Sequence, residues 1–252
     1  MIVAENFSLG RADLERWMVE FATEVIDQQQ ALSDLDAASG DADHGSNMER
    51  GLSSLLLLMP RWDRSTSPGQ FLKGVGLHVV GSVGGSSGAL YGTIFLRMAR
   101  VVDKTDPIPT GVFVAALEAA VQGVMERGKV RLNDKTMLDA FAPGVEALAE
   151  HVRKGEPLAV ALAASSTAAE EGRDATADMV ARRGKSSYAR ERSRGWVDPG
   201  AASVTLLLQT AARALVTLAP INPEAVDTNP GIVKEFRPPD EQVTVPPPIE
   251  GC

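Results

Sequence analysis

The sequence predicts an all-α protein of about eight helices, followed by an extended C-terminal segment. Apolar residues recur at three- and four-residue spacing from residue 11 to about 218, the period of a helix with one buried face. Ala, Leu and Val supply most of the apolar content, while aromatic residues make up only 5% of the chain. From Pro220 to Cys252 eight of 33 residues are proline, which cannot continue a helix. We therefore expect a helical domain over 1–218 and a Pro-rich tail over 219–252.

The helices are predicted one by one from the same spacing. In the first, Leu14, Trp17, Met18, Phe21 and Val25 lie on one face, and the helix runs up to the Ser39-Gly40 break. Further helices are predicted near 46–59, 68–81, 86–102, 110–127, 135–152, 157–183 and 198–218. No segment alternates strongly enough to predict a strand, and no internal repeat is found.

Composition and charge exclude several classes of protein. The formal net charge of −8 argues against nucleic acid as a main partner, because such proteins present a basic face. No run reaches the roughly 18 apolar residues of a membrane span. The only cysteine is Cys252, which excludes an internal disulfide, and the polar N-terminus does not resemble a signal peptide. We therefore expect a cytoplasmic protein.

Three carboxylates, Asp36, Asp41 and Asp43, fall within eight residues. Hard divalent cations need several oxygen ligands, and Mg²⁺ shares its shell between carboxylates and phosphate oxygens. Asp41 and Asp43, one residue apart in extended backbone, would point toward one metal pair, with Asp36 closing the site. On the carboxylates alone, a loop that caps the following helix is an equal alternative. An EF-hand is a weaker one, because Glu49 is not at the required distance.

Two further segments suggest anion binding. Gly84 to Gly88 contains only glycine and serine before an apolar helix, and a helix start of this kind offers backbone N–H groups to an anion. It lacks the Gly-Lys-Ser/Thr element of a Walker loop, and small residues also serve close packing. The segment Gly184 to Arg194 is rich in basic residues that would neutralise phosphate, although charge alone favours a solvated loop.

Taken together, these segments resemble the L subunit of bacterial dihydroxyacetone kinase and the homologous C-terminal domain of single-chain dihydroxyacetone kinases. The resemblance runs from about residue 10 to 218. It rests on Leu35-Asp36, on 40–48, 84–92 and 134–139, and on 184–200. It implies a barrel of eight antiparallel helices with a nucleotide bound at one end.

The resemblance also implies roles for individual residues. Asp36, Asp41 and Asp43 would coordinate two Mg²⁺ ions that bridge the phosphates of ADP or ATP, as metal ligands and not as general bases. The phosphates would be lined by His44, Gly45, Ser46, Asn47, Ser86 and Ser87. Gly128 and Met137 would lie near the base or ribose, and the site would be closed by Lys185, Asp198, Pro199 and Gly200. No side chain is expected to be catalytic itself.

The sequence departs from the family in four places. Ala42 stands where the family usually has glycine, a small change if the backbone angle φ there is negative. Asn133 replaces the glycine before Asp-Lys-Thr-Met. Lys185 replaces an arginine, which keeps the charge but loses the planar fork that grips phosphate. The Pro-rich tail is extra, and a docking segment for another subunit is one interpretation of it.

The resemblance implies that the chain is one of two kinds of subunit that together make a ketose kinase. The chain would carry Mg-ADP or Mg-ATP and pass a phosphoryl group to dihydroxyacetone, or a related ketose such as erythrulose, held on a separate K subunit. Either a phosphohistidine phosphotransferase protein would recharge bound ADP, or ATP would exchange. The resemblance allows a homodimer. The alternatives are a nucleotide-loaded regulatory module that binds a transcription factor, the nucleotide domain of fatty-acid kinases, which has threonine in place of His44, and an unrelated helical bundle.

Overall fold

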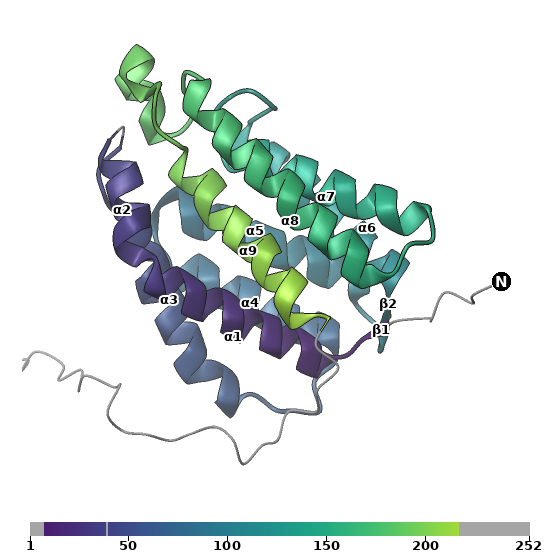
Figure 1. Ribbon diagram of the computed structural model, residues 1–252. Coiled ribbons are helices and arrows are strands. Elements are labelled where there is room, and N and C mark those ends of the chain that lie inside the picture. Colours follow the sequence, from purple (N-terminus) through teal and green to yellow (C-terminus); the bar gives the residue numbers. More distant parts are fainter. Residues whose placement is uncertain (1–7, 39, 217–252) are drawn as a thin grey trace, which may run out of the picture. The chain divides into compact units, whose positions relative to one another are not determined.

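The computed structural model describes residues 8–38 and 40–216, and within them the protein consists mainly of helices (Figure 1). The α-helices are α1 Arg11–Asp27, α2 Gln29–Ala37, α3 His44–Leu58, α4 Pro68–Ser82, α5 Gly85–Val102, α6 Thr110–Gly128, α7 Leu138–Arg153, α8 Leu158–Ala175 and α9 Pro199–Ala214. The 3-10 helices are η1 Met59–Arg61, η2 Thr176–Asp178 and η3 Lys185–Ser193. The predicted all-α class is confirmed. The Pro-rich tail lies outside the described residues.

Eight of these helices form a closed ring. α1 packs against α3, each helix from α3 to α8 packs against the next one in the chain, and α9 returns to α1 (Figure 1). The short α2 stands outside this ring and packs against α3 and α9. The ring matches the predicted barrel. Among the described helices, none combines the length and the apolar character that crossing a membrane requires.

Large side chains fill the interior of the ring. Trp17 packs edge-on against Phe113 with ring centroids 5.9 Å apart, and Phe21 stacks on Tyr91 at the same distance. The indole N–H of Trp17 donates to the carbonyl oxygen of Leu207 at 2.9 Å, which ties α1 to α9 where the ring closes. Aromatic pairs and a hydrogen-bonded indole stabilise the fold beyond the burial of apolar area alone. This core therefore holds the ring helices in fixed positions.

Two predicted helices differ from the structure. The first one breaks at Gln28, whose backbone leaves helical geometry, so that α1 and α2 are separate helices. The helix predicted over 157–183 ends at Ala175. It is followed by η2 and by Met179 in extended backbone.

A two-stranded sheet was not predicted. β1 (Ser8–Leu9) pairs antiparallel with β2 (Ile108–Pro109), with Leu9 opposite Ile108. Both apolar side chains are fully buried and cover the core at the start of α1 and α6. Strands of two residues are too short to produce the alternation that a sequence pattern needs.

Candidate functional site

A cavity of about 330 Å³ opens at one end of the ring, where several helices begin. Its wall includes His44 at the start of α3, Gly85 at the start of α5, Met137 just before α7 and Pro199 at the start of α9. The first N–H groups of a helix have no partner within the helix, and the helix dipole places partial positive charge there. Four helix starts around one cavity give it an electrostatic environment that favours anions.

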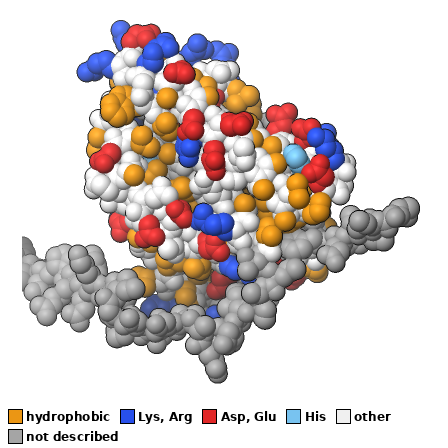
Figure 2. Space-filling view, viewed as in Figure 1, with side chains coloured by type: hydrophobic (Ala, Val, Ile, Leu, Met, Phe, Trp, Pro, Cys, Tyr) orange, Lys and Arg blue, Asp and Glu red, His pale blue; other side chains and the backbone are white. Residues whose placement is uncertain are grey.

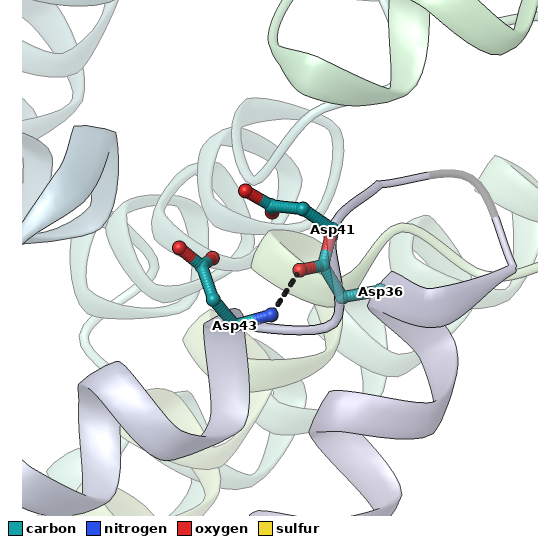
Figure 3. A group of neighbouring side chains, drawn as sticks. All are labelled: Asp36, Asp41 and Asp43. Carbon is teal, nitrogen blue, oxygen red and sulfur yellow. Dashed lines mark hydrogen bonds between the residues drawn. The ribbon is translucent and has the colours of Figure 1, made fainter.

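The three predicted carboxylates meet at this cavity, one from the end of α2 and two from the loop that leads to α3 (Figure 3). One carboxylate oxygen from each of Asp36, Asp41 and Asp43 lies within 4.8 Å of the others. Asp36, at the end of α2, accepts hydrogen bonds from the backbone N–H groups of Asp43 at 2.9 Å and His44 at 3.2 Å. This arrangement has the oxygen donors and the spacing that a hard divalent cation requires.

Lys185 reaches this cluster from η3. Its ammonium group donates hydrogen bonds to Asp41 and, at 2.9 Å, to Asp43. These contacts raise the pKa of Lys185 and lower that of Asp41. Asp36 behaves in the opposite way, because burial first and its acidic neighbours second raise its pKa. The cluster therefore concentrates negative charge that one lysine balances only in part.

The backbone between the two loop aspartates is not extended. Ala42 has φ +61°, in the left-handed region, which corrects the expectation of extended backbone. The condition under which alanine would be a small change from glycine is therefore not met. A non-glycine residue there is strained by about 1–2 kcal/mol. Asn133, the other replacement of a family glycine, also has a positive φ of 69°, which asparagine tolerates better than most residues. The alanine therefore matters more than the sequence indicated.

His44 is buried in a hydrogen-bonded position that joins three helices. Its Nδ1 lies 3.0 Å from the hydroxyl of Ser87 on α5, and its Nε2 lies 2.9 Å from the hydroxyl of Ser203 on α9. The Tyr91 hydroxyl donates to Ser203 at 2.8 Å. Burial lowers the pKa of His44 to about 4, so the ring is neutral at pH 7. The histidine thus fixes the mutual positions of three helices that wall the cavity.

Most of the predicted site residues meet at the cavity. Those that line it are Asp36, Asp43, His44, Asn47, Ser86, Ser87, Gly128, Met137, Lys185, Asp198, Pro199 and Gly200. Asp41 joins them through the carboxylate cluster. Gly45 and Ser46 are not part of the wall. Gly45 packs against the backbone of α2, and the Ser46 hydroxyl donates back to the carbonyl oxygen of Asp43 at 3.1 Å.

The structure adds residues that the sequence did not single out. Leu90, Val124 and Val130 add apolar side chains to the wall of the cavity, together with Met137. Lys135 is 1% exposed, and its ammonium group donates to the carbonyl oxygens of Thr176 and Trp196, both at 2.5 Å. Lys135 belongs to the Asp-Lys-Thr-Met run quoted above, but its burial depends on partners 41 and 61 residues away.

Asp198 makes the free energy of unfolding depend on pH. It caps α9 by accepting the Ala201 N–H at 2.8 Å, and burial raises its pKa to about 7. Because its unfolded pKa is about 4, its contribution to the free energy of unfolding is present below about pH 4 and is lost as the pH rises through 7. Asn at this position keeps the acceptor and cannot ionise.

We therefore expect the melting temperature of Asp198→Asn, relative to the parent, to rise as the pH increases from about 5 to about 8. The opposing contribution of His44 is the same in both proteins and cancels in this difference. Thermal denaturation across the range measures it. A difference that stays constant with pH would contradict the raised pKa of Asp198.

Comparison with known proteins identifies the family. The DAK2 domain matches residues 38–213. The chain belongs to the DAK2 domain family. It is 37% identical over 207 residues to the ADP-binding subunit DhaL of the PEP-dependent dihydroxyacetone kinase of Escherichia coli K12, covering 82% of this chain and 98% of that one. To the corresponding subunit of kinase 1 of Listeria innocua it is 38% identical over 202 residues, covering 80% and 96%. The resemblance inferred from the motifs is thereby confirmed.

The fold of this DAK2 domain also matches a solved structure. The dihydroxyacetone kinase of C. freundii in complex with AMP-PNP and Mg²⁺ aligns with a TM-score of 0.61 at 22% identity. The alignment covers 85% of this chain but 36% of that longer one. At this identity the match supports the helical fold and says nothing about individual contacts.

Proposed function

We propose that the chain is the nucleotide-carrying subunit of a dihydroxyacetone or short-ketose kinase, which holds ADP or ATP with two Mg²⁺ ions. The observation that carries this proposal is the meeting of four helix starts and three carboxylates at one cavity with apolar side chains in its wall. The helix starts are suited to phosphate groups, the carboxylates to Mg²⁺, and the apolar side chains to a nucleobase. The ADP-binding relatives support the same assignment.

Each part of the cavity has a distinct task in this proposal. Asp36, Asp41 and Asp43 hold the ions, and Mg²⁺ supplies the charge that neutralises phosphate oxygens during phosphoryl transfer. Ser86 and Ser87 bind phosphate oxygens at the start of α5. The apolar side chains near Met137 hold the base. No residue acts as a general base here, so the chain contributes position and electrostatics.

The acceptor ketose must come from another chain. The described residues form a single ring of helices, and the family resemblance assigns the ketose to a separate K subunit. Two donors are compatible with this arrangement. A phosphohistidine protein recharges tightly held ADP, or ATP enters and ADP leaves. Identifying the nucleotide released on denaturation separates them, because only the first scheme leaves near-stoichiometric ADP on the purified protein.

Phosphoryl transfer tests the proposal as a whole. The purified chain is mixed with Mg²⁺, dihydroxyacetone and a K subunit of the family, and ketose phosphate is measured with ATP or with a phosphohistidine donor. Product that depends on all components is the expected result. Tight nucleotide binding without product from either donor would instead favour the regulatory alternative.

Lys185→Ala tests the lysine that contacts Asp41 and Asp43. We expect nucleotide affinity to fall by about tenfold to a hundredfold, because removal of one charge-assisted contact is worth roughly 1.5–3 kcal/mol. Stability should change little, because Lys185 and both of its partners are substantially exposed. Calorimetric titration with Mg-ADP and a denaturation curve give the two values. An affinity equal to the parent's would remove Lys185 from the site.

A further inference from the structure

Residues 182–196, here called the basic arm, project from the cavity end of the ring between η2 and α9. Six of the 15 residues are Lys or Arg and one is acidic, in a chain whose net charge is −8. In Figure 1 the arm is the green segment that extends above the ring, and blue side chains gather at the top of the view in Figure 2. Within the described residues, no acidic side chain pairs with Arg190 or Arg192.

Two aromatic side chains accompany this charge. Tyr188 is 86% exposed and Trp196 is 50% exposed, and both belong to the arm. Exposed aromatic rings are unfavourable on a surface that meets only water. Tyr, Trp and Arg are also the three residue types that dominate the binding energy of protein interfaces. The arm thus has the composition of a docking surface.

The arm is held in one shape by hydrogen bonds, most of which tie it to neighbouring segments. At its neck, the N–H of Gly195 donates to the carbonyl oxygen of Ala177 at 2.8 Å, and Lys135 binds the carbonyl oxygen of Trp196. Inside it, the Ser193 hydroxyl accepts the N–H of Ala181 at 2.9 Å and donates to the Arg190 carbonyl oxygen at 2.6 Å. A partner that binds a preformed surface loses less conformational entropy on association.

Arg190 lies in backbone that favours glycine. Its φ of 50° and ψ of −127° fall in a region that side chains with a Cβ adopt only under strain. A glycine would remove this strain without loss to the fold. An arginine here therefore indicates that its side chain serves something other than the stability of the chain.

We propose that the basic arm docks an acidic surface of the protein that presents the phosphoryl acceptor, the ketose-binding subunit of the proposed function. The arm stands beside the cavity, because Arg183, Gly184 and Lys185 form part of the cavity wall. A partner seated on the arm would thus face the nucleotide. The opposite charges would both speed the encounter and orient it. This inference rests on the proposed function for the identity of the partner.

The test measures binding of a purified family K subunit to the full chain in the presence of Mg-ADP, by calorimetry at low and high salt. Variants Arg190→Gly, Arg192→Glu and Tyr188→Ala probe the arm. Arg153→Glu, an exposed charge reversal at the far end of α7, is the control. We expect each arm variant to weaken the complex about tenfold or more, with Arg153→Glu unchanged. Parent affinity should fall with salt, and less steeply for Arg192→Glu.

Arg190→Gly gives a signature that a structural role does not produce. We expect its melting temperature to rise while its affinity for the K subunit falls. Mg-ADP affinity should remain that of the parent in all three variants, which separates a failure of the arm from a failure of the nucleotide site. Arm variants that bind the K subunit as the parent does would overturn the proposal. So would a parent that binds Mg-ADP but not the K subunit, or an arm that instead drives binding to phosphatidylserine vesicles or self-association.

Discussion

Asp41→Asn and Asp43→Asn are each expected to abolish retention of the Mg-nucleotide while the helices stay intact. Each change removes the charge of a proposed metal ligand from a cluster whose oxygens lie within 4.8 Å of one another. Loss of an outer-sphere partner alone weakens metal binding by about 10–100-fold, so loss of a direct ligand should exceed about a hundredfold. Calorimetry with Mg-ADP measures the affinity, and far-ultraviolet circular dichroism measures the helical content.

The fold should tolerate these changes because neither side chain supports it. The carboxylate of Asp43 stands at the start of α3 without capping it, and that of Asp41 contacts the exposed Lys185. Asp34→Asn is the matched control, because it removes the same charge from an exposed position on α2, where its partner is Gln30. Unchanged nucleotide and Mg²⁺ binding in both loop variants would contradict the metal site.

Gly45→Ala is expected to have the largest effect on stability. A Cβ atom there would lie 2.0 Å from the carbonyl oxygen of Gln29 and 2.8 Å from the backbone nitrogen of Ser33. Both atoms belong to the backbone of α2, so the contact is relieved only if α2 moves away from α3. Overpacking of this kind costs about 3 kcal/mol. Because α2 carries Asp36, we expect Mg-nucleotide affinity to fall as well.

Gly81→Ala is the control for that substitution. Gly81 lies near the end of α4 with no atom within 4 Å of an added Cβ. Alanine is the better helix former, so this variant should gain up to about 1 kcal/mol. Urea denaturation of both proteins gives the comparison. Equal stability of Gly45→Ala and the parent would mean that α2 and α3 are not in contact at this point.

The features that the sequence predicted are those that depend on residues close together in the chain. Helical spacing predicted the helices of the ring, because each of them buries one face, and the family resemblance predicted that they form a barrel. The break at Gln28 escaped notice, because apolar residues continue across it at helical spacing. The end of α8 at Ala175 was missed because the residues beyond it are small enough to extend a helix. The positive φ of Ala42 was not predictable, because alanine is not a residue type that indicates a left-handed backbone.

In the candidate site, too, local features were predicted and contacts between distant residues were not. Asp36, Asp41 and Asp43 are close in the sequence and were predicted together, and the structure brings them together. Gly45 belongs to the same run but faces α2, since successive residues at a helix start point in different directions. The buried position of Lys135 depends on two distant carbonyl oxygens. No local pattern predicts such contacts.

Titration of nucleotide-free protein with ADP, in the presence and in the absence of Mg²⁺, tests the central claim most directly. If the cavity and its carboxylates form one Mg-nucleotide site, calorimetry will show binding at one ADP per chain that disappears when Mg²⁺ is chelated. Failure to bind ADP or ATP with Mg²⁺ present would contradict the account, as would an affinity that is the same without the ion.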